Sequence, residues 1–370
     1  MAIPSSGIGE LRLGGRYYGG WTKLSVTRSI EQIAGSFDLE VTERWAGQAT
    51  ARAIVPGEAC EVLLDGETVI DGYIDDVLPE YDAENHTVRI AGRDKTGDLV
   101  DCSAVYKTGQ WHSVTLDTLA RDLIAPFGIG LVIDTEVGAA FSSYSIQEGE
   151  TVFECLERAA RMKAVLLVSD AQGNLVITRA GDQVVGVQLV EGQNILAASG
   201  QFGWKDRYST YTVKGQVKAD DDFFGENAAQ PKGVAIDDTI NRYRPLVVLA
   251  EEHGHGATLK DRAEWERSVR MGRGNRGAVT VQGWRRPDGA LWQPNTLVPV
   301  RSPMLSLDAP MLIVGCTWRL DERGTTTQLT IARRESFVLV SGVARSKLAK
   351  KLNDKAQKEK KKKGDDWSML

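Results

Sequence analysis

Cysteine is scarce in this chain of 370 residues, and the few cysteines are far apart. The four lie at Cys60, Cys102, Cys155 and Cys316, more than forty residues from one another, and none forms a CxxC pair. A disulfide framework or a zinc-binding motif built on cysteine is therefore not expected. We interpret them as small hydrophobic residues in a reducing compartment.

Long apolar runs are also missing. Runs such as "PLVVLA" at 245–250 are much too short to cross a bilayer. No charged start is followed by an apolar stretch, so neither a signal peptide nor a membrane anchor is expected. With 42% hydrophobic and 26% charged residues, the composition is typical of a soluble globular protein with two or three domains.

The common signatures of catalysis and cofactor binding do not occur. There is no GxSxG, GxxxxGK[ST] or GxGxxG pattern, and no cysteine lies near a histidine in sequence. The best metal candidate is "HGH" at 253–255, with Glu251 and Glu252 nearby. Spacing identifies no third ligand, so we interpret these as solvated loop histidines and expect no metal, cofactor or catalytic residue. The basic, glycine-rich "GRGNRG" at 272–277 is interpreted first as a helix stop, with phosphate contact as the alternative.

One stretch is rich in acids: "VIDGYIDDVLPEYD" at 69–82. In an extended chain Asp71 and Asp75 would lie roughly 13 Å apart, too far to share a metal ion or act on one glycosidic bond. The alternation of apolar residues slips after Asp75, which predicts a β-bulge at the Asp75–Asp76 doublet. The pattern favours a charged strand over an acid/base site.

The predicted fold class is α+β, mainly β, with two related small β-barrel domains, an inserted α/β module and a further helical excursion. Residues 1–105 contain strand patterns separated by Gly, Pro, Asp and Asn turns, which predict the first barrel. Apolar residues at helical spacing in 113–128 and 151–164, each followed by a short strand, predict the α/β module over 106–182. A second barrel is assigned to 183–217 and 275–340, and a loop and helix excursion to 218–274.

The second barrel is inferred from an internal repeat. "IVGCTWRLDERGTTTQLTIARRE" (313–335) aligns with "IDGYIDDVLPEYDAENHTVRIAGRD" (70–94), "GAVTVQGWR" (277–285) with "GSFDLEVTERW" (35–45), and "YTVKG" (211–215) with "LSVTR" (24–28). This alignment keeps Gly72 as Gly315 but changes Asp71, Asp75 and Asp76 to Val314, Trp318 and Arg319. We therefore predict that the three acids are dispensable, and that Gly72 and Gly315 serve folding at strand bends or close crossings.

The end of the chain differs in charge from the rest. Residues 345–370 hold ten Lys or Arg and four Asp or Glu, whereas the whole chain has a net charge of −5. The "KEKKKK" run predicts an extended basic tether within a C-terminal tail, 341–370. Trp367, Met369 and Leu370 form an apolar end beyond it and are the candidate partner-binding residues. A solvated tail, or docking onto the acidic body of the protein itself, are the alternatives.

Three further stretches resemble a known family: "EGQNILAASGQFGWKDRYSTYTVKGQ" (191–216), "RYRPLVVLAEE" (242–252) and "GWRRPDGALWQPNTLVPVRSP" (283–303). With the two barrels around an α/β insert, they resemble the baseplate hub protein of Mu-like contractile phages, the tail protein P family. That family is in turn similar to the hub part of type VI secretion spikes.

The resemblance implies a structural protein and no enzyme: a homotrimer in which two barrels per subunit form a ring of pseudo-sixfold symmetry. Such a ring would join the hexameric tail tube protein to the trimeric central spike protein. Other baseplate proteins and the tape measure protein are further expected partners, in a virion tail assembled in the host cytoplasm. The competing hypotheses are a tail-associated cell-wall hydrolase and a nucleic-acid-binding adaptor that acts through the lysine-rich tail.

Overall fold

The computed structural model describes residues 9–42, 54–83, 86–215, 232–249 and 256–338. The chain divides into two compact units. Unit 1 comprises residues 1–201 and 275–334, and unit 2 comprises residues 202–274 and 335–370. The fold is α+β and mainly β, as the sequence predicts.

The first half of the large sheet in unit 1 is built from the N-terminal strands. Its hairpins follow local turn chemistry: Asp65 and Gly66 both have positive φ and join β5 to β6, as a tight Asp-Gly turn requires. The hydrogen-bonded order is β3-β4-β7-β6-β5-β1-β2. The strands are β1 (Glu10–Leu13), β2 (Arg16–Tyr18), β3 (Lys23–Ser29), β4 (Ser36–Thr42), β5 (Ala59–Leu64), β6 (Glu67–Tyr81) and β7 (His86–Asp94).

The second half repeats this arrangement. Its order, β14-β18-β21-β20-β19, has the same connectivity as β3-β4-β7-β6-β5, which confirms the internal repeat. A short strand, β13, pairs with β19. The strands are β13 (Leu189–Val190), β14 (Ala197–Phe202), β18 (Asn275–Gln282), β19 (Leu297–Ser302), β20 (Leu307–Asp321) and β21 (Gly324–Ala332), followed by a 3-10 turn, Arg334–Ser336.

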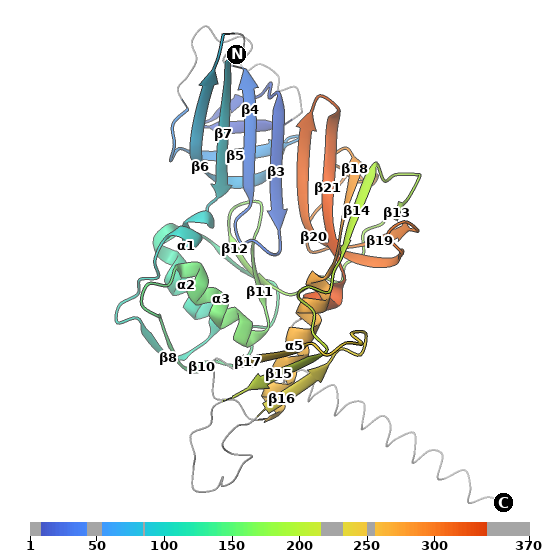
Figure 1. Cartoon of the computed structure of the whole chain (residues 1–370). Coiled ribbons are helices and arrows are strands. Elements are labelled where there is room, and N and C mark those ends of the chain that lie inside the picture. Colours follow the sequence, from blue (N-terminus) through green and yellow to red (C-terminus); the bar gives the residue numbers. More distant parts are fainter. Residues whose placement is uncertain (1–8, 43–53, 84–85, 216–231, 250–255, 339–370) are drawn as a thin grey trace, which may run out of the picture. The chain divides into compact units, whose positions relative to one another are not determined.

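The two halves meet where β3 pairs with β20, so that all thirteen strands belong to one sheet (Figure 1). Six antiparallel pairs make this junction, from Leu24–Leu320 to Ser29–Gly315. The Oγ1 atoms of Thr27 and Thr317 are 3.0 Å apart across it. The two halves are therefore joined by main-chain hydrogen bonds between β3 of the first half and β20 of the second.

Two strands of fifteen residues, β6 and β20, occupy the same place in the repeat. Each pairs with the preceding hairpin strand along its first part and with the following strand along its second part. The register shifts between Ile74 and Asp76 in β6, which confirms the predicted bulge at the acid doublet. In β20 the shift lies between Ile313 and Gly315.

These bulges correct the alignment proposed from sequence. They make Asp75 the counterpart of Val314, whereas the shared I-x-G letters had matched Asp75 with Trp318. The sequence alignment is therefore four residues out of register. The acids still do not recur, because Asp75 corresponds to Val314 and Asp76 to Gly315. The predicted equivalence of Gly72 and Gly315 is wrong, since Gly72 lies before the bulge and Gly315 after it.

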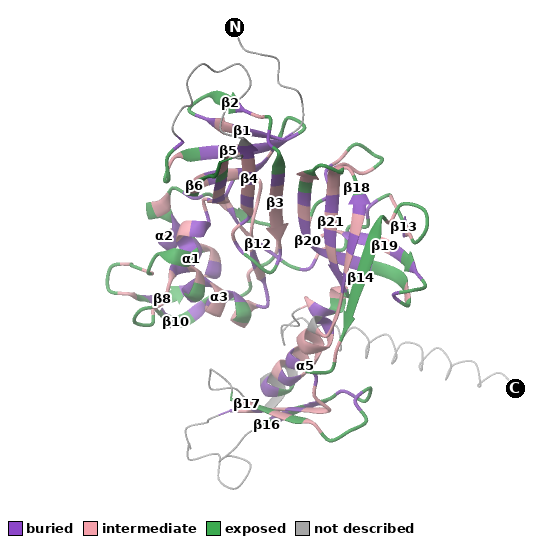
Figure 2. Ribbon diagram, turned by 45° about the horizontal axis from the view of Figure 1, so that its top comes forward, coloured by how far each residue is buried: buried purple, intermediate pink, exposed green. Residues whose placement is uncertain are grey.

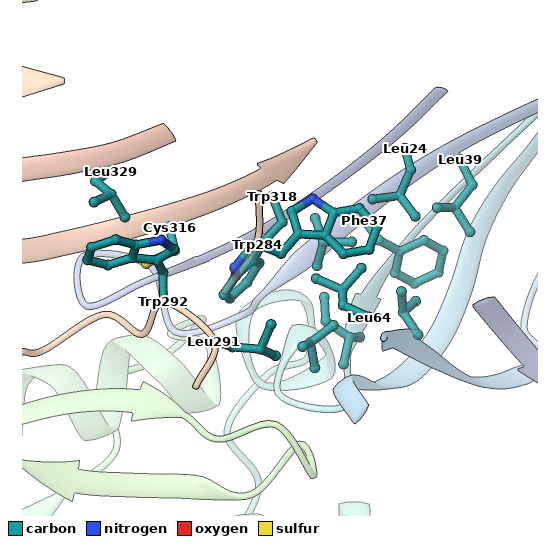
Figure 3. Packing of buried hydrophobic residues seen from close by; sticks show 14 of the residues in the cluster. Leu24, Phe37, Leu39, Leu64, Trp284, Leu291, Trp292, Cys316, Trp318 and Leu329 are labelled. Carbon is teal, nitrogen blue, oxygen red and sulfur yellow. The ribbon is translucent and has the colours of Figure 1, made fainter. Parts of the chain in front are cut away.

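A single hydrophobic core extends over both halves of the sheet. Trp318 of β20 lies beside Phe37 of β4, with Trp284 and Trp292 nearby (Figure 3). Trp318 is 1% exposed, and the indole of Trp284 donates to the carbonyl oxygen of Arg319. Burial of large aromatic surface stabilises the two halves together.

The α/β module has its own core and a three-stranded sheet ordered β11-β12-β9. The predicted helices are confirmed as α2 and α3, and Thr151 begins α3 with a capping box to Glu154. The elements are α1 (Gly97–Asp101), β8 (Gln110–Val114), α2 (Leu116–Ile124), a 3-10 turn (Ala125–Phe127), β9 (Leu131–Ile133), β10 (Phe141–Ser145), α3 (Val152–Lys163), β11 (Leu166–Ser169) and β12 (Leu175–Thr178). The predicted start at residue 106 is too late, because α1 packs on α3 and buries Leu99 in the core of the module.

In its described residues, unit 2 contains a three-stranded sheet with one helix packed on it. Its elements are β15 (Thr210–Lys214), β16 (Lys232–Ile236), β17 (Pro245–Leu249) and α5 (Gly256–Arg273), the last confirming the helix predicted within the excursion over 218–274. The assignment of 211–215 to the second barrel is wrong. β15 pairs with β16 and β17, and Tyr211 and Val213 pack against Leu259 and Ala263.

Candidate assembly interface

The strand β14 is an exposed edge of the large sheet. All six of its residues are exposed, and its hydrogen-bonded neighbour is β18 on one side (Figure 2). Its sequence, "AASGQF", has no charge and no proline, the two devices that usually protect an edge strand. An unprotected edge of this kind is suited to pairing with another strand.

A second free edge lies on the last six residues of β6, Asp76–Tyr81, which we call the outer segment of β6. It pairs with β7, whereas β5 pairs only with the earlier residues, up to Tyr73. Leu78 is 49% exposed and Tyr81 is 80% exposed. Among the described residues, no strand covers the other side of this segment.

Unit 2 adds an exposed apolar face to its sheet. β16 places Val234 and Ile236 on this face, and β17 places Val247 and Leu249 there. The opposite face of the same strands is covered by α5. Exposed apolar surface of this kind is typical of contact sites between proteins.

Two of the acids at 69–82, Asp71 and Asp75, are held in separate surface ion pairs. Asp71 pairs with Lys95, and Asp75 pairs with Arg93 at 2.7 Å. Arg93 also binds Asp101 at 2.6 Å, and Asp76 is exposed. The described residues contain no group of three or more His, Cys, Asp or Glu that could hold a metal ion. The structure therefore does not bring these acids together as a site.

Gly72 and Gly315 lie in unequal surroundings. A Cβ on Gly72 would come within 2.0 Å of the carbonyl oxygen of Arg93 and 2.4 Å of the Asp94 Cα. A Cβ on Gly315 would come within 3.3 Å of the carbonyl oxygen of Arg28, which is tight but not a collision. The close crossing proposed for both glycines is thus much tighter at Gly72.

The thiols are placed for packing. Burial raises the pKa of Cys60 and of Cys155 to about 12, so both are protonated at neutral pH. Burial also raises the pKa of the Cys316 thiol, and Cys102 is exposed. None of the buried thiols has the lowered pKa of a nucleophile.

Several residues singled out from sequence lie outside the described part of the chain. They are Glu251, Glu252, the histidines of 253–255, and Trp367, Met369 and Leu370 of the tail. The "GRGNRG" motif is described: α5 ends at Arg273 and β18 begins at Asn275, as its interpretation as a helix stop predicts. No helix in the described residues is long and apolar enough to span a membrane.

Sequence reasoning missed the two free edges. β14 has no alternation of apolar residues, because neither of its faces is buried, and the outer segment of β6 was judged only for its acids. The absence of charge and proline from 197–202 was the available signal.

Comparison with protein families finds three matches along the chain. Residues 9–94 match the family described as "Mu phage baseplate assembly protein GpP-like, N-terminal". Residues 96–179 match "Baseplate hub protein gp44-like, second domain", and residues 255–340 match "Mu phage baseplate assembly protein GpP, fourth domain". The boundary between the first two matches, at residues 94–96, agrees with the assignment of α1 to the α/β module.

Individual proteins give the same result. The baseplate hub protein gp44 of Escherichia phage Mu is 37% identical over 338 residues, covering 89% of this chain and 88% of that protein. The 43 kDa tail protein of prophage MuSo2 from Shewanella oneidensis is 40% identical, with a TM-score of 0.82 over 90% of this chain and 99% of that one. A tail protein from Neisseria meningitidis MC58 is 25% identical, with a TM-score of 0.78 over 90% and 98% of the two chains. A type VI secretion component, E. coli c3393, shares the fold at 10% identity and a TM-score of 0.54, over 90% of this chain and 79% of its own.

Proposed function

This chain belongs to the family of Mu phage baseplate hub proteins, and from that premise we propose that three copies form a ring joining the tail tube to the central spike. It is a structural component of a phage tail, and its homologues are hub proteins rather than enzymes. In the proposed ring the three copies form a trimer of pseudo-sixfold symmetry.

The observation that carries the proposal is the repeated strand order. β3-β4-β7-β6-β5 and β14-β18-β21-β20-β19 present two similar halves within one chain. Three such chains supply six similar halves, which is what a threefold ring needs in order to meet a sixfold tube. The symmetric ring also gives the free edges of β14 and β6 a use.

The expected partners are the tail tube protein, the spike protein and other baseplate proteins, with the tape measure protein as a further candidate. The exposed face of Val234, Ile236, Val247 and Leu249 supports contact with one of these components. Assembly takes place in the host cytoplasm before the hub becomes part of the virion tail.

The proposal is tested by assembling the purified protein with the tube and spike proteins of the same phage. Electron micrographs should show the tube on one face of the ring and the spike on the other. Binding of both proteins to the same face, or of neither, would contradict the proposed role.

Cell-wall cleavage by the purified protein would favour the hydrolase hypothesis. DNA binding that is strongly salt-dependent and lost with residues 345–370 would favour the nucleic-acid adaptor.

A further inference from the structure

We propose that β14 of one copy pairs antiparallel with the outer segment of β6 in the next copy, and that this pairing is the junction between subunits. The inference rests on the proposed ring and names the strands and the register that would close it. Its template is the β3–β20 junction within the chain.

The internal repeat assigns the two strands to this role. β14 is the edge strand of the second half, as β3 is the edge strand of the first half, and β6 corresponds to β20. Within the chain, β3 pairs with β20. The other strands of these two kinds are β14 and β6, and within the described residues no strand pairs with their corresponding edges. Repeating the junction between copies links the second half of one to the first half of the next.

The bulges fix which residues of β6 take part. Because Asp75 corresponds to Val314, the outer segment Asp76–Tyr81 corresponds to residues 315–320 of β20. Those residues of β20 are the ones that pair with β3. The outer segment of β6 is therefore the counterpart of the part of β20 that is used in the junction.

The neighbouring strands fix the register of β14. Gly92 and Ile331 occupy equivalent positions, because each pairs with the residue just before a bulge. Phe37 of β4 pairs with Gly92, and Gly277 of β18 pairs with Ile331, so Phe37 and Gly277 are counterparts. Phe37 pairs with Val26. Leu196 N donates to Thr280 O at 2.9 Å, and antiparallel pairing from this bond brings Ser199 opposite Gly277. A Cβ on Gly277 would accordingly lie 3.4 Å from the carbonyl oxygen of Ser199. Ser199 is thus the counterpart of Val26.

With Ser199 at the place of Val26, residues 24–29 of β3 correspond to 197–202 of β14. These six residues are the whole of β14, and the outer segment of β6 also has six. The register pairs Asp76 with Phe202, Leu78 with Gly200, and Tyr81 with Ala197.

The side chains suit this pairing. β14 carries no charge, so it adds no repulsion beside Asp76 and Glu80 of the outer segment. Gly200 leaves room opposite Leu78, and the exposed Phe202 and Tyr81 stand near opposite ends of the proposed pair. Pro79 has no N–H, which removes one donor from the six-residue segment.

Disulfide cross-linking tests the register. Leu78 and Gly200 are the counterparts of Thr317 and Thr27, whose side chains touch across the internal junction. In a Cys102→Ser background, Leu78→Cys combined with Gly200→Cys should give covalently linked trimers on a non-reducing denaturing gel after mild oxidation. Glu80→Cys with Ala198→Cys, one pair further along the same face, should do the same.

The matched control is Leu78→Cys with Ser199→Cys, which places the two thiols on opposite faces of the sheet and should cross-link much less. A trimeric mass with no cross-link from either matched pair would overturn the junction while leaving the proposed ring standing. Dimers formed by Gly200→Cys alone would show β14 pairing with itself and would also overturn the junction. A monomeric mass would refute the ring and the junction together.

Discussion

At the scale of single residues, Asp94 is a buried acid that accepts hydrogen bonds from several parts of the fold. It is 2% exposed and accepts hydrogen bonds from Gly35 N at 2.6 Å, Thr96 N at 2.9 Å and Ser169 Oγ at 2.6 Å. These donors come from the first half of the sheet, from the residues that precede α1, and from the α/β module. Asp94 therefore connects the module to the sheet.

We predict that Asp94→Asn lowers the free energy of unfolding by roughly 3 kcal/mol, because an amide N–H₂ group then faces donors that need an acceptor. Urea unfolding of the purified protein measures this change. The control replaces Asp71, Asp75 and Asp76 by Asn. It should leave assembly intact, since partly exposed ion pairs contribute about 1 kcal/mol or less each. A stable Asp94 variant together with loss of assembly in the triple variant would contradict the account.

The two glycines of the I-x-G motifs give a second prediction. Gly72→Ala should destabilise the protein by about 3 kcal/mol, because the new Cβ would overlap the main chain of β7 at Arg93. Gly315→Ala should cost less than about 1 kcal/mol, since its Cβ meets Arg28 O at 3.3 Å. Soluble yield and thermal unfolding of the two variants provide the measurement. Equal effects would show that the environment of one glycine has been misjudged.

At the scale of secondary-structure elements, the hydrophobic spacing of the sequence predicted those elements that are determined by local sequence. The helices α2 and α3 and the bulge at Asp75 follow from apolar spacing in the sequence. The five residues of α1 are too few to show a helical period, and β15 has the same alternation as any half-buried strand. Its true partners, β16 and β17, are set by packing against α5, which the sequence pattern does not reveal.

The candidate interface was less predictable than the fold. A strand that is exposed on both faces, as β14 is, carries no hydrophobic pattern before its partner binds. The internal repeat was visible in the succession of strand and turn patterns, yet its register was wrong, because the I-x-G letters precede the bulge in β6 but span the bulge in β20. Equivalent residues in the two halves are therefore defined by main-chain pairing and not by identical residue types.

The C-terminal tail is a separate element in sequence, and its role stays a prediction. Deleting residues 345–370 should leave the ring folded while weakening capture of the spike or another tail protein. The reason is that Trp367, Met369 and Leu370 form an apolar end beyond a basic run that repels itself. Pull-down with the tail proteins and the yield of infectious particles measure the effect.

Replacement of Trp367, Met369 and Leu370 by alanine in the full-length chain is the control for that deletion, since it keeps the basic run. It should reproduce most of the loss. Partner binding and particle yield that stay unchanged after the deletion would leave the tail as a solvated segment.

At the scale of the whole molecule, the large sheet consists of two similar halves, and the junction between them leaves one complementary edge on each half. The shared core holds the two halves together as one folded unit, and the edges of β14 and β6 are the surfaces that the proposed ring would cover. The heterologous pairing of such edges produces a closed ring when the rotation between copies allows it.

The mass of the purified protein in solution tests this account most directly. Light scattering coupled to size-exclusion chromatography, at micromolar concentration and moderate salt, should give three times the 40.4 kDa mass of the chain. A mass that stays at that of one chain at every concentration tried would contradict the trimeric hub.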